Sequence, residues 1–165
     1  MQLLLCTLLV SAAPPTASVV LVQGDVVAQP PKGKVFGKLA VGDQLRAGTR
    51  VRVGEGRAEL KFADGTKVRV HKNSEVRVAP RSPDKTSSVS LFFGRVWSKV
   101  VKKVRGGRSF EVQTANAVAG VRGTELEVGV ADDGAARVLV HTGKVEVAGE
   151  SGSAVPIGRG FEIQR

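Results

Sequence analysis

The stretch "VRVGEGRAELKFADGTKVRVHKNSEVRV", residues 51–78, alternates apolar and polar side chains over most of its length. This alternation is typical of β-strands that bury one face and leave the other in water. Asp64 and Gly65 lie between two of the alternating runs, where a tight two-residue turn would join antiparallel strands. The stretch therefore predicts antiparallel hairpins with one wet face.

Runs of the same kind continue to the end of the chain, each bounded by Gly, Asn, Asp or Ser: "VSLFFG", "FEVQT", "GTELEVGV", "ARVLVH", "GKVEVAG" and "FEIQ". Valine dominates the apolar residues and glycine occurs 20 times, which suits strands joined by turns. The 165 residues, 42% of them hydrophobic, are enough for one domain. We predict an all-β fold of about a dozen short, mostly antiparallel strands in two packed sheets, arranged as a sandwich, a roll or a solenoid-like stack.

An internal repeat is visible within these runs. "VRVHKNSEVRV" (68–78) and "VLVHTGKVEV" (138–147) share a Val-x-Val-His frame, a polar turn and a second Val-x-Val. Upstream of each unit lies an Asp-Gly pair, and farther upstream lies a Gly-Thr pair, although the spacing between the two pairs differs by six residues. We expect the two units to occupy related positions in the fold.

The N-terminal stretch "MQLLLCTLLVSAAPPTAS" has an apolar run followed by small residues, which is the layout of a secretory signal peptide. Cleavage after Ala12, Ala13 or Ala17 would remove Cys6 and leave a mature chain without cysteine. A lipid-modified Cys6 and the stump of a longer membrane anchor are the alternatives. We expect an exported protein of the periplasm or cell envelope, with no transmembrane span in its mature chain.

Three regions follow from this pattern. Residues 1–18 are the predicted signal peptide, and residues 40–165 form the main β domain. Between them, residues 19–39 are predicted as an N-terminal hairpin and loop, because two apolar runs flank Gly24-Asp25 and a Pro-rich and Gly-rich segment comes next.

Charge is distributed unevenly along the chain. Residues 1–108 carry 20 Lys and Arg against seven Asp and Glu, whereas residues 109–165 carry five against eight. A basic half attracts anionic partners, such as lipid headgroups, wall polymers or nucleic acid, although scattered charges are also the ordinary solvent face of alternating strands. We exclude nucleic acid because an exported protein rarely meets it.

"GRVWSKVVKKVR" (94–105) is the most basic segment, and it fits either a membrane-surface helix or a valine-rich strand. An aromatic residue flanked by basic ones suits contact with an anionic surface, although a partly buried Trp beside solvent-facing Lys and Arg is the simpler interpretation of the pattern. The candidate contact residues in and after this segment are Arg95, Trp97, Lys99, Lys102, Lys103, Arg105 and Arg108.

No catalytic signature is recognisable. The sequence lacks a Gly-x-Ser-x-Gly elbow, a His-Glu-x-x-His pair and a phosphate-binding glycine loop. His71 and His141 occupy equivalent repeat positions and could begin a metal site on neighbouring strands, but no third ligand accompanies them, and the adjacent valines predict that both point to water. We expect no enzyme activity, no metal and no cofactor.

The C-terminal half carries a family resemblance. "GRVWSKVVKKVRGGRSFEVQTANAVAGVRGTELEV", followed by "DDGAARVLVHTGKVEV", resembles the FecR domain family, and the likeness extends over about residues 40–163. Its most specific part is the step Val121, Arg122, Gly123 and Thr124; Ala115-Asn116 stands where the family frequently has proline. The resemblance implies a periplasmic signalling domain that passes the state of an outer-membrane transporter to a cytoplasmic sigma factor.

The same four-residue step has a structural interpretation from its own chemistry. Gly123 permits positive φ or close backbone approach, Thr124 can bond a turn backbone, and the Arg122 guanidinium can cap carbonyls or bind a carboxylate. We favour a structural clasp over a ligand site.

The function we expect is a non-catalytic binding or sensing module of the envelope, whose partner is another envelope protein or an anionic envelope polymer. The 165 residues include neither a cytoplasmic anti-sigma region nor a full membrane helix, so a stand-alone interaction role is expected. The alternative is a basic structural protein that adheres to anionic cell wall or membrane. The sequence leaves the oligomeric state open.

Overall fold

The computed structural model describes residues 15–80, 86–102, 110–149, 153–160 and 162–164, which form fourteen β-strands and no helix. None of these residues belongs to a helix of the length and apolar character needed to cross a bilayer. The all-β prediction is confirmed. The strands are β1 (Ala17–Gln29), β2 (Gly37–Lys38), β3 (Gln44–Leu45), β4 (Arg50–Phe62), β5 (Lys67–Val70), β6 (Ser74–Val78), β7 (Ser87–Lys99), β8 (Phe110–Gln113), β9 (Ala117–Val121), β10 (Glu125–Val130), β11 (Ala136–Thr142), β12 (Lys144–Gly149), β13 (Ala154–Gly158) and β14 (Glu162–Gln164).

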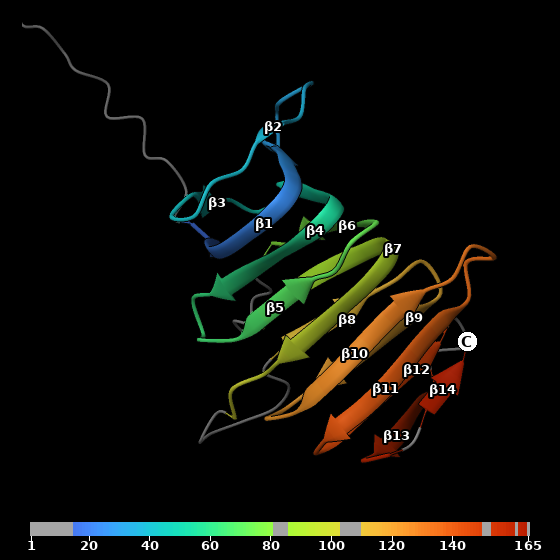
Figure 1. Ribbon diagram of the computed structural model, residues 1–165. Coiled ribbons are helices and arrows are strands. Elements are labelled where there is room, and N and C mark those ends of the chain that lie inside the picture. Colours follow the sequence, from blue (N-terminus) through green and yellow to red (C-terminus); the bar gives the residue numbers. More distant parts are fainter. Residues whose placement is uncertain (1–14, 81–85, 103–109, 150–152, 161, 165) are drawn as a thin grey trace, which may run out of the picture.

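Strand pairing forms two layers that share three long strands. The first sheet has the order β1-β4-β5-β7-β10-β11-β14 and is antiparallel throughout. The second sheet has the order β2-β1-β4-β6-β7-β8-β9-β12-β13, in which β7 and β8 are the one parallel pair among the described strands. Figure 1 shows the layers one behind the other, with β1 to β3 at one end and β13 and β14 at the other.

The long strands β1, β4 and β7 each bend sharply, which lets one strand contribute a half to each sheet. In β1 and β4 the bend lies where Gly24 pairs with Gly56, and both glycines have positive φ, at 76° and 128°. A Cβ on Gly56 would lie 2.0 Å from the carbonyl oxygen of Gln23, so no larger residue fits without movement of the backbone. β7 bends in the same way at Gly94, where φ is 85°.

The space between the sheets is filled by small and branched side chains. β4, β5, β7 and β6 pair in a closed ring, and inward valines such as Val51, Val68, Val76 and Val96 are fully buried within it. Farther along, Phe62 of the first sheet meets Phe110 of the second edge to face, at 5.0 Å between ring centroids. The alternation of the sequence therefore corresponds directly to inside and outside.

The internal repeat is also visible in the fold. Each Val-x-Val-His unit starts on a first-sheet strand, β5 or β11, and continues on a second-sheet strand, β6 or β12. The Asp-Gly turns before β5 and β11 have the same geometry: Asp64 Oδ1 accepts from the Thr66 backbone N–H, and Asp133 Oδ1 accepts from that of Ala135, both at 2.9 Å. The two units therefore occupy related positions, as predicted.

The hairpin predicted within residues 19–39 is wrong. Gly24-Asp25 does not reverse the chain, because both residues lie inside the continuous strand β1, which pairs with β4 along nearly its whole length. A positive-φ glycine suits a turn and a bulged strand alike, and here it bends a strand instead of closing a turn. After β1, the segment 30–49 runs back along the edge of that strand through β2 and β3.

Candidate functional site

The step Val121, Arg122, Gly123 and Thr124 is the place where the chain crosses from one sheet to the other. Val121 ends β9 in the second sheet, and β10 in the first sheet begins one residue after Thr124. Gly123 has a φ of 63°, and a Cβ there would lie 2.6 Å from the Cβ of Lys102. The positive φ expected from the sequence is therefore present, and close packing adds a second requirement for glycine.

Thr124 provides the polar bond of this crossing. Its side chain is buried, and its hydroxyl lies 2.9 Å from the carbonyl oxygen of Lys144 and 3.3 Å from that of Arg122. The bond to Lys144 joins the start of β10 to the start of β12, which belongs to the other sheet. This geometry suits the clasp interpretation, while the exposed Arg122 remains a candidate for anchoring or recognition.

The basic segment after residue 94 is a strand and not a helix. Val96 and Ser98 point into the core, whereas Arg95, Trp97 and Lys99 lie on the outer face of the first sheet. Side chains of a strand alternate with a period of two, and burial of Val96, Ser98 and Val100 follows that period. Val101 lies beyond the end of β7 and is exposed. Lys102 is exposed beyond β7, and Lys103, Arg105 and Arg108 lie outside the described residues.

On this outer face the charges are partly paired. Arg95 Nη1 lies 3.4 Å from Glu127 Oε1, and the half-buried ring of Trp97 is covered by the Arg69 guanidinium, with 5.1 Å from Arg69 Cζ to the ring centroid. Arg95, Trp97 and Lys99 are thus brought onto one face, where Glu127 partly offsets the charge of Arg95, whereas Lys102 lies beyond the strand.

One row on the same face concentrates positive charge. Lys61 of β4 lies directly opposite Lys67 of β5, and Lys67 lies opposite Lys99 of β7. We call these three residues the lysine row. Like charges directly opposite one another are unfavourable for folding, but carboxylates offset part of this charge. Lys67 Nζ lies 3.6 Å from Glu59 Oε1, and Lys99 lies opposite Glu125 of β10.

The two histidines are not neighbours. β5 and β11 are separated in the first sheet by β7 and β10, which corresponds to three strand spacings, or roughly 14 Å. His141 is exposed as expected, but His71 is half-buried, and its Nε2 is buried without a hydrogen-bond partner among the described residues. The expectation that His71 points freely to water is therefore wrong.

A further cluster lies on the outer face of the second sheet. It combines three exposed or half-exposed aromatic rings with three guanidinium groups around one carboxylate. We call it the aromatic–arginine face, and its members are Phe36, Arg50, Arg52, Glu75, Arg77, Phe92 and Phe93.

A β-bulge in β7 creates the aromatic part of this face. In the pairing with β6, Val76 lies opposite Leu91 and Glu75 opposite Phe93, so two residues of β7 are accommodated where one would be regular. Leu91 points into the core, and both Phe92 and Phe93 are left outside, 42% and 44% exposed. A bulge of this kind re-aims side chains and is frequent beside binding sites.

Glu75 organises the arginines. Its side chain is 1% exposed and is paired with Arg50 Nη2 and with Arg52 Nε, the latter at 2.6 Å. Each guanidinium also stacks on a ring: Arg52 Cζ lies 4.5 Å from the centroid of Phe36, and Arg50 Cζ lies 5.2 Å from that of Phe92. Charge-assisted bonds together with cation–π contacts hold both forks in fixed orientations.

The third arginine is not neutralised. Arg77 is exposed, and its Cζ lies 5.4 Å from the centroid of Phe92. Its cross-strand partner is Arg50, and the described residues provide no carboxylate within ion-pair distance of it. Among the described residues, two of the three arginines share one carboxylate and the third has none, so the face keeps a net positive charge.

Sequence reasoning missed this face because it depends on a bulge and on register. One signal was present: Phe92 and Phe93 are consecutive, in a chain with only six phenylalanines, and strict alternation would bury one of them. No pattern in the sequence places Phe36, from the segment after β1, beside Arg52.

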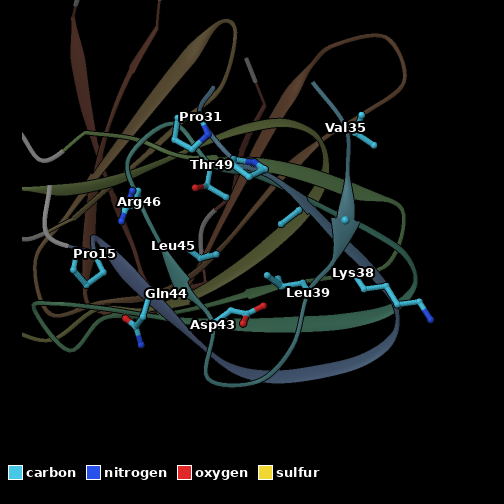
Figure 2. Close-up of a pocket in the computed structure, with 13 residues that line it drawn as sticks. Pro15, Pro31, Val35, Lys38, Leu39, Asp43, Gln44, Leu45, Arg46 and Thr49 are labelled. Carbon is cyan, nitrogen blue, oxygen red and sulfur yellow. The ribbon is translucent and has the colours of Figure 1, made fainter. Parts of the chain in front are cut away.

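A groove of about 740 Å³ lies beside this face, between β1 and the segment 30–49. Figure 2 shows Leu39 and Leu45 toward its centre, Pro15 and Pro31 at its margin, and the Lys38 side chain extending away. The lining is mostly apolar, so the groove could hold an apolar group, but no contact in the structure identifies one.

Comparison with known proteins connects the fold to a family. The model of the family described as FecR protein matches residues 49–146, which is more than half of the chain. No curated protein matches. Two crystal structures of a candidate anti-sigma factor from Parabacteroides distasonis ATCC 8503, at 2.50 and 1.65 Å resolution, are similar, each with 24% identity and a TM-score of 0.61 over 70% of this chain. The chain covers 53% of that protein's length, and at this identity the likeness concerns the fold.

Proposed function

Because the chain belongs to the FecR protein family, we propose that it is a non-catalytic module of the cell envelope that binds a protein partner and takes part in signalling. The observation that carries the proposal is the aromatic–arginine face. Aromatic residues and arginine are the residue types enriched at the centres of protein–protein interfaces. Here they form a preorganised group on the outside of a rigid sheet.

Burial on this face supports binding rather than folding. Phe92 and Phe93 leave a large part of their rings in water, where each exposed ring costs hydration free energy that a partner would recover. The bulge that exposes both of them replaces a regular pairing in which one would be buried. The fold therefore gives up core packing at the place where the arginines are gathered.

The location of this activity is part of the proposal. An apolar run followed by small residues precedes the described residues and supports export to the periplasm. In that compartment, a chain of this family would meet the periplasmic parts of envelope proteins, and we expect its partner among them.

Capture from envelope extracts tests the proposal. The chain carrying a C-terminal tag is incubated with envelope proteins from its own source cells, alongside a Phe92→Ala, Phe93→Ala double variant. Both side chains lie outside the core, 42% and 44% exposed, so we expect the double variant to keep the parent's fold, which its melting temperature and far-ultraviolet spectrum check. We expect one envelope protein to be captured by the parent and lost with the double variant.

A matched variant tests the alternative of adhesion to an anionic surface. The lysine row favours such adhesion, because its exposed ammonium groups attract anionic polymers without specific geometry. Replacing Lys61, Lys67 and Lys99 by Gln should leave capture of the protein partner intact. If the lysine variant instead abolishes retention on wall material or on phosphatidylglycerol vesicles, and the double phenylalanine variant changes nothing, then adhesion is the function and the proposal is wrong.

A further inference from the structure

Resting on the proposed function, we infer the chemistry of the partner: the aromatic–arginine face binds an acidic segment of that protein. Carboxylates of the segment pair with the outward donors of Arg77 and Arg52. Apolar side chains between those carboxylates pack on Phe92, Phe93 and Phe36.

The first step of the argument is the charge on the face. Glu75 is the carboxylate that pairs with Arg50 and Arg52, and Arg77 adds a further positive charge directly opposite Arg50. Two like charges in opposite positions on adjacent strands destabilise a sheet. A carboxylate of a partner placed above them removes this repulsion, so the arrangement favours an anionic occupant.

The second step is the preorganisation of the donors. Arg52 donates its Nε–H to Glu75 Oε2, and stacking on Phe36 fixes the plane of the fork. Arg77 is stacked on Phe92 and keeps its guanidinium donors available for a carboxylate. Planar, fixed forks suit bidentate pairing with carboxylates, and little side-chain entropy is lost when they bind.

The third step distinguishes a protein segment from a membrane surface. A lipid surface is contacted well by flexible lysines, and these are grouped on the opposite sheet in the lysine row. The aromatic–arginine face instead places guanidinium groups and a ring at fixed positions on neighbouring strands: Arg50 lies opposite Arg77, and Arg52 and Phe93 lie on either side of Glu75. An extended acidic segment presents carboxylates and apolar side chains at a comparable spacing.

A defined probe tests the inference. The probe is a short fluorescent peptide in which glutamate alternates with alanine around a central leucine pair, and its control is the same peptide with glutamine in place of glutamate. Binding is measured by fluorescence anisotropy at low and high salt. We expect the glutamate peptide to bind the parent at least about tenfold more tightly than the glutamine peptide, with a difference that shrinks as salt rises.

Variants assign the binding to named residues. Arg77→Gln should weaken binding of the glutamate peptide roughly tenfold, and Arg77→Lys should weaken it by about threefold or more, because lysine keeps the charge but loses the fork. Arg159→Gln is the matched control: Arg159 is exposed in the turn after β13, at the far edge of the second sheet, and the change removes the same charge. That variant should bind like the parent.

Three results would overturn the inference. They are equal binding of the two peptides, an Arg77→Gln variant that binds like the parent, and Arg77-dependent binding of phosphatidylglycerol vesicles without binding of the peptide. Failure here is separable from failure of the proposed function. If capture of the envelope protein depends on Phe92 and Phe93 but not on Arg77, the face binds a protein whose contacting segment is not acidic.

Discussion

At the scale of single residues, Gly123 combines a backbone requirement with a packing requirement. Its φ of 63° is costly for a residue with a Cβ, and the Lys102 side chain occupies the space where a Cβ would be. We expect Gly123→Val to lower the free energy of unfolding by about 1–3 kcal/mol, measured by urea denaturation. Gly134→Val is the control, since Gly134 has a φ of 85° but a Cβ there would meet no atom within 4 Å, so it should cost less. Equal losses would show that packing against Lys102 is unimportant.

Two buried threonines differ in whether their hydroxyl groups are hydrogen-bonded. Thr124 bonds the carbonyl oxygen of Lys144, whereas the buried hydroxyl of Thr66 has no partner among the described residues. Thr124→Val should therefore destabilise the fold by about 1 kcal/mol, while Thr66→Val should be neutral or stabilising. Chemical denaturation of both variants measures the difference. If both behave alike, the clasp interpretation of this crossing loses its support.

His71 gives the stability of the fold a dependence on pH. Burial, followed by the positive charge of Arg95, lowers the pKa of His71 below its ordinary value of 6.5; Arg69 and Arg57 act in the same direction, and Glu127 opposes them. The folded state therefore binds the His71 proton less readily than the unfolded chain does. This contribution to stability is fully present above pH 6.5 and is lost as the pH falls from 6.5 through the lowered pKa.

Replacing His71 should remove that dependence. We expect the free energy of unfolding of His71→Gln to change less between about pH 7.5 and about pH 5 than that of the parent, a window chosen around the ordinary histidine pKa of about 6.5. His141→Gln, at an exposed position on β11, is the control and should keep the slope of the parent. A parent and a His71→Gln variant with the same slope would contradict the assignment.

At the scale of elements, the bends in β1 and β4 decide how the two sheets are connected. Gly24 and Gly56 face each other so closely that a Cβ on either would collide with the backbone of the opposite strand. Gly56→Ala should cost roughly 2–5 kcal/mol, because it adds both strain at positive φ and a backbone clash. Gly37→Ala in β2, where a Cβ would have nothing within 4 Å, should be tolerated. Urea denaturation of both variants decides the point, and a Gly56→Ala variant as stable as the parent would mean that the bend does not need glycine.

At the scale of the whole molecule, we propose that the leader is cleaved at a site that leaves all of β1 in the mature chain. The backbone N–H of Thr16 donates to the carbonyl oxygen of Leu45, and Ala17 is buried and pairs with Leu45 and Phe62. Cleavage after Ala12 or Ala13 keeps these contacts, whereas cleavage after Ala17 removes them. We therefore expect N-terminal sequencing of envelope material to find a start at residue 13 or 14. An intact Met1 on protein recovered from the cytosol would contradict export.

The alternation of apolar and polar side chains along the sequence was sufficient to predict the all-β fold class. In residues 51–78 apolar side chains recur at alternate positions, which alone specifies strands with one buried face, and Asp64-Gly65 and Asp133-Gly134 close turns as their chemistry requires. The Val-x-Val-His units and the positive φ of Gly123 follow from equally local information, whereas the pattern of residues 94–105 fitted a helix or a strand until the structure showed β7. These features depend on contacts between residues near one another in the chain.

The tertiary structure decided the features that depend on contacts distant in the sequence. Whether a glycine closes a turn or bends a strand is set by its cross-strand neighbour, so the role of Gly24 is defined only by the presence of Gly56 opposite it. The bulge that places Phe92 and Phe93 outside, and the register that gathers Arg50, Arg52 and Arg77 around Glu75, likewise arise from pairing between β4, β6 and β7. Alternation fixes which face a residue occupies, but register alone determines which residues of other strands share that face, and the candidate site is made of such neighbours.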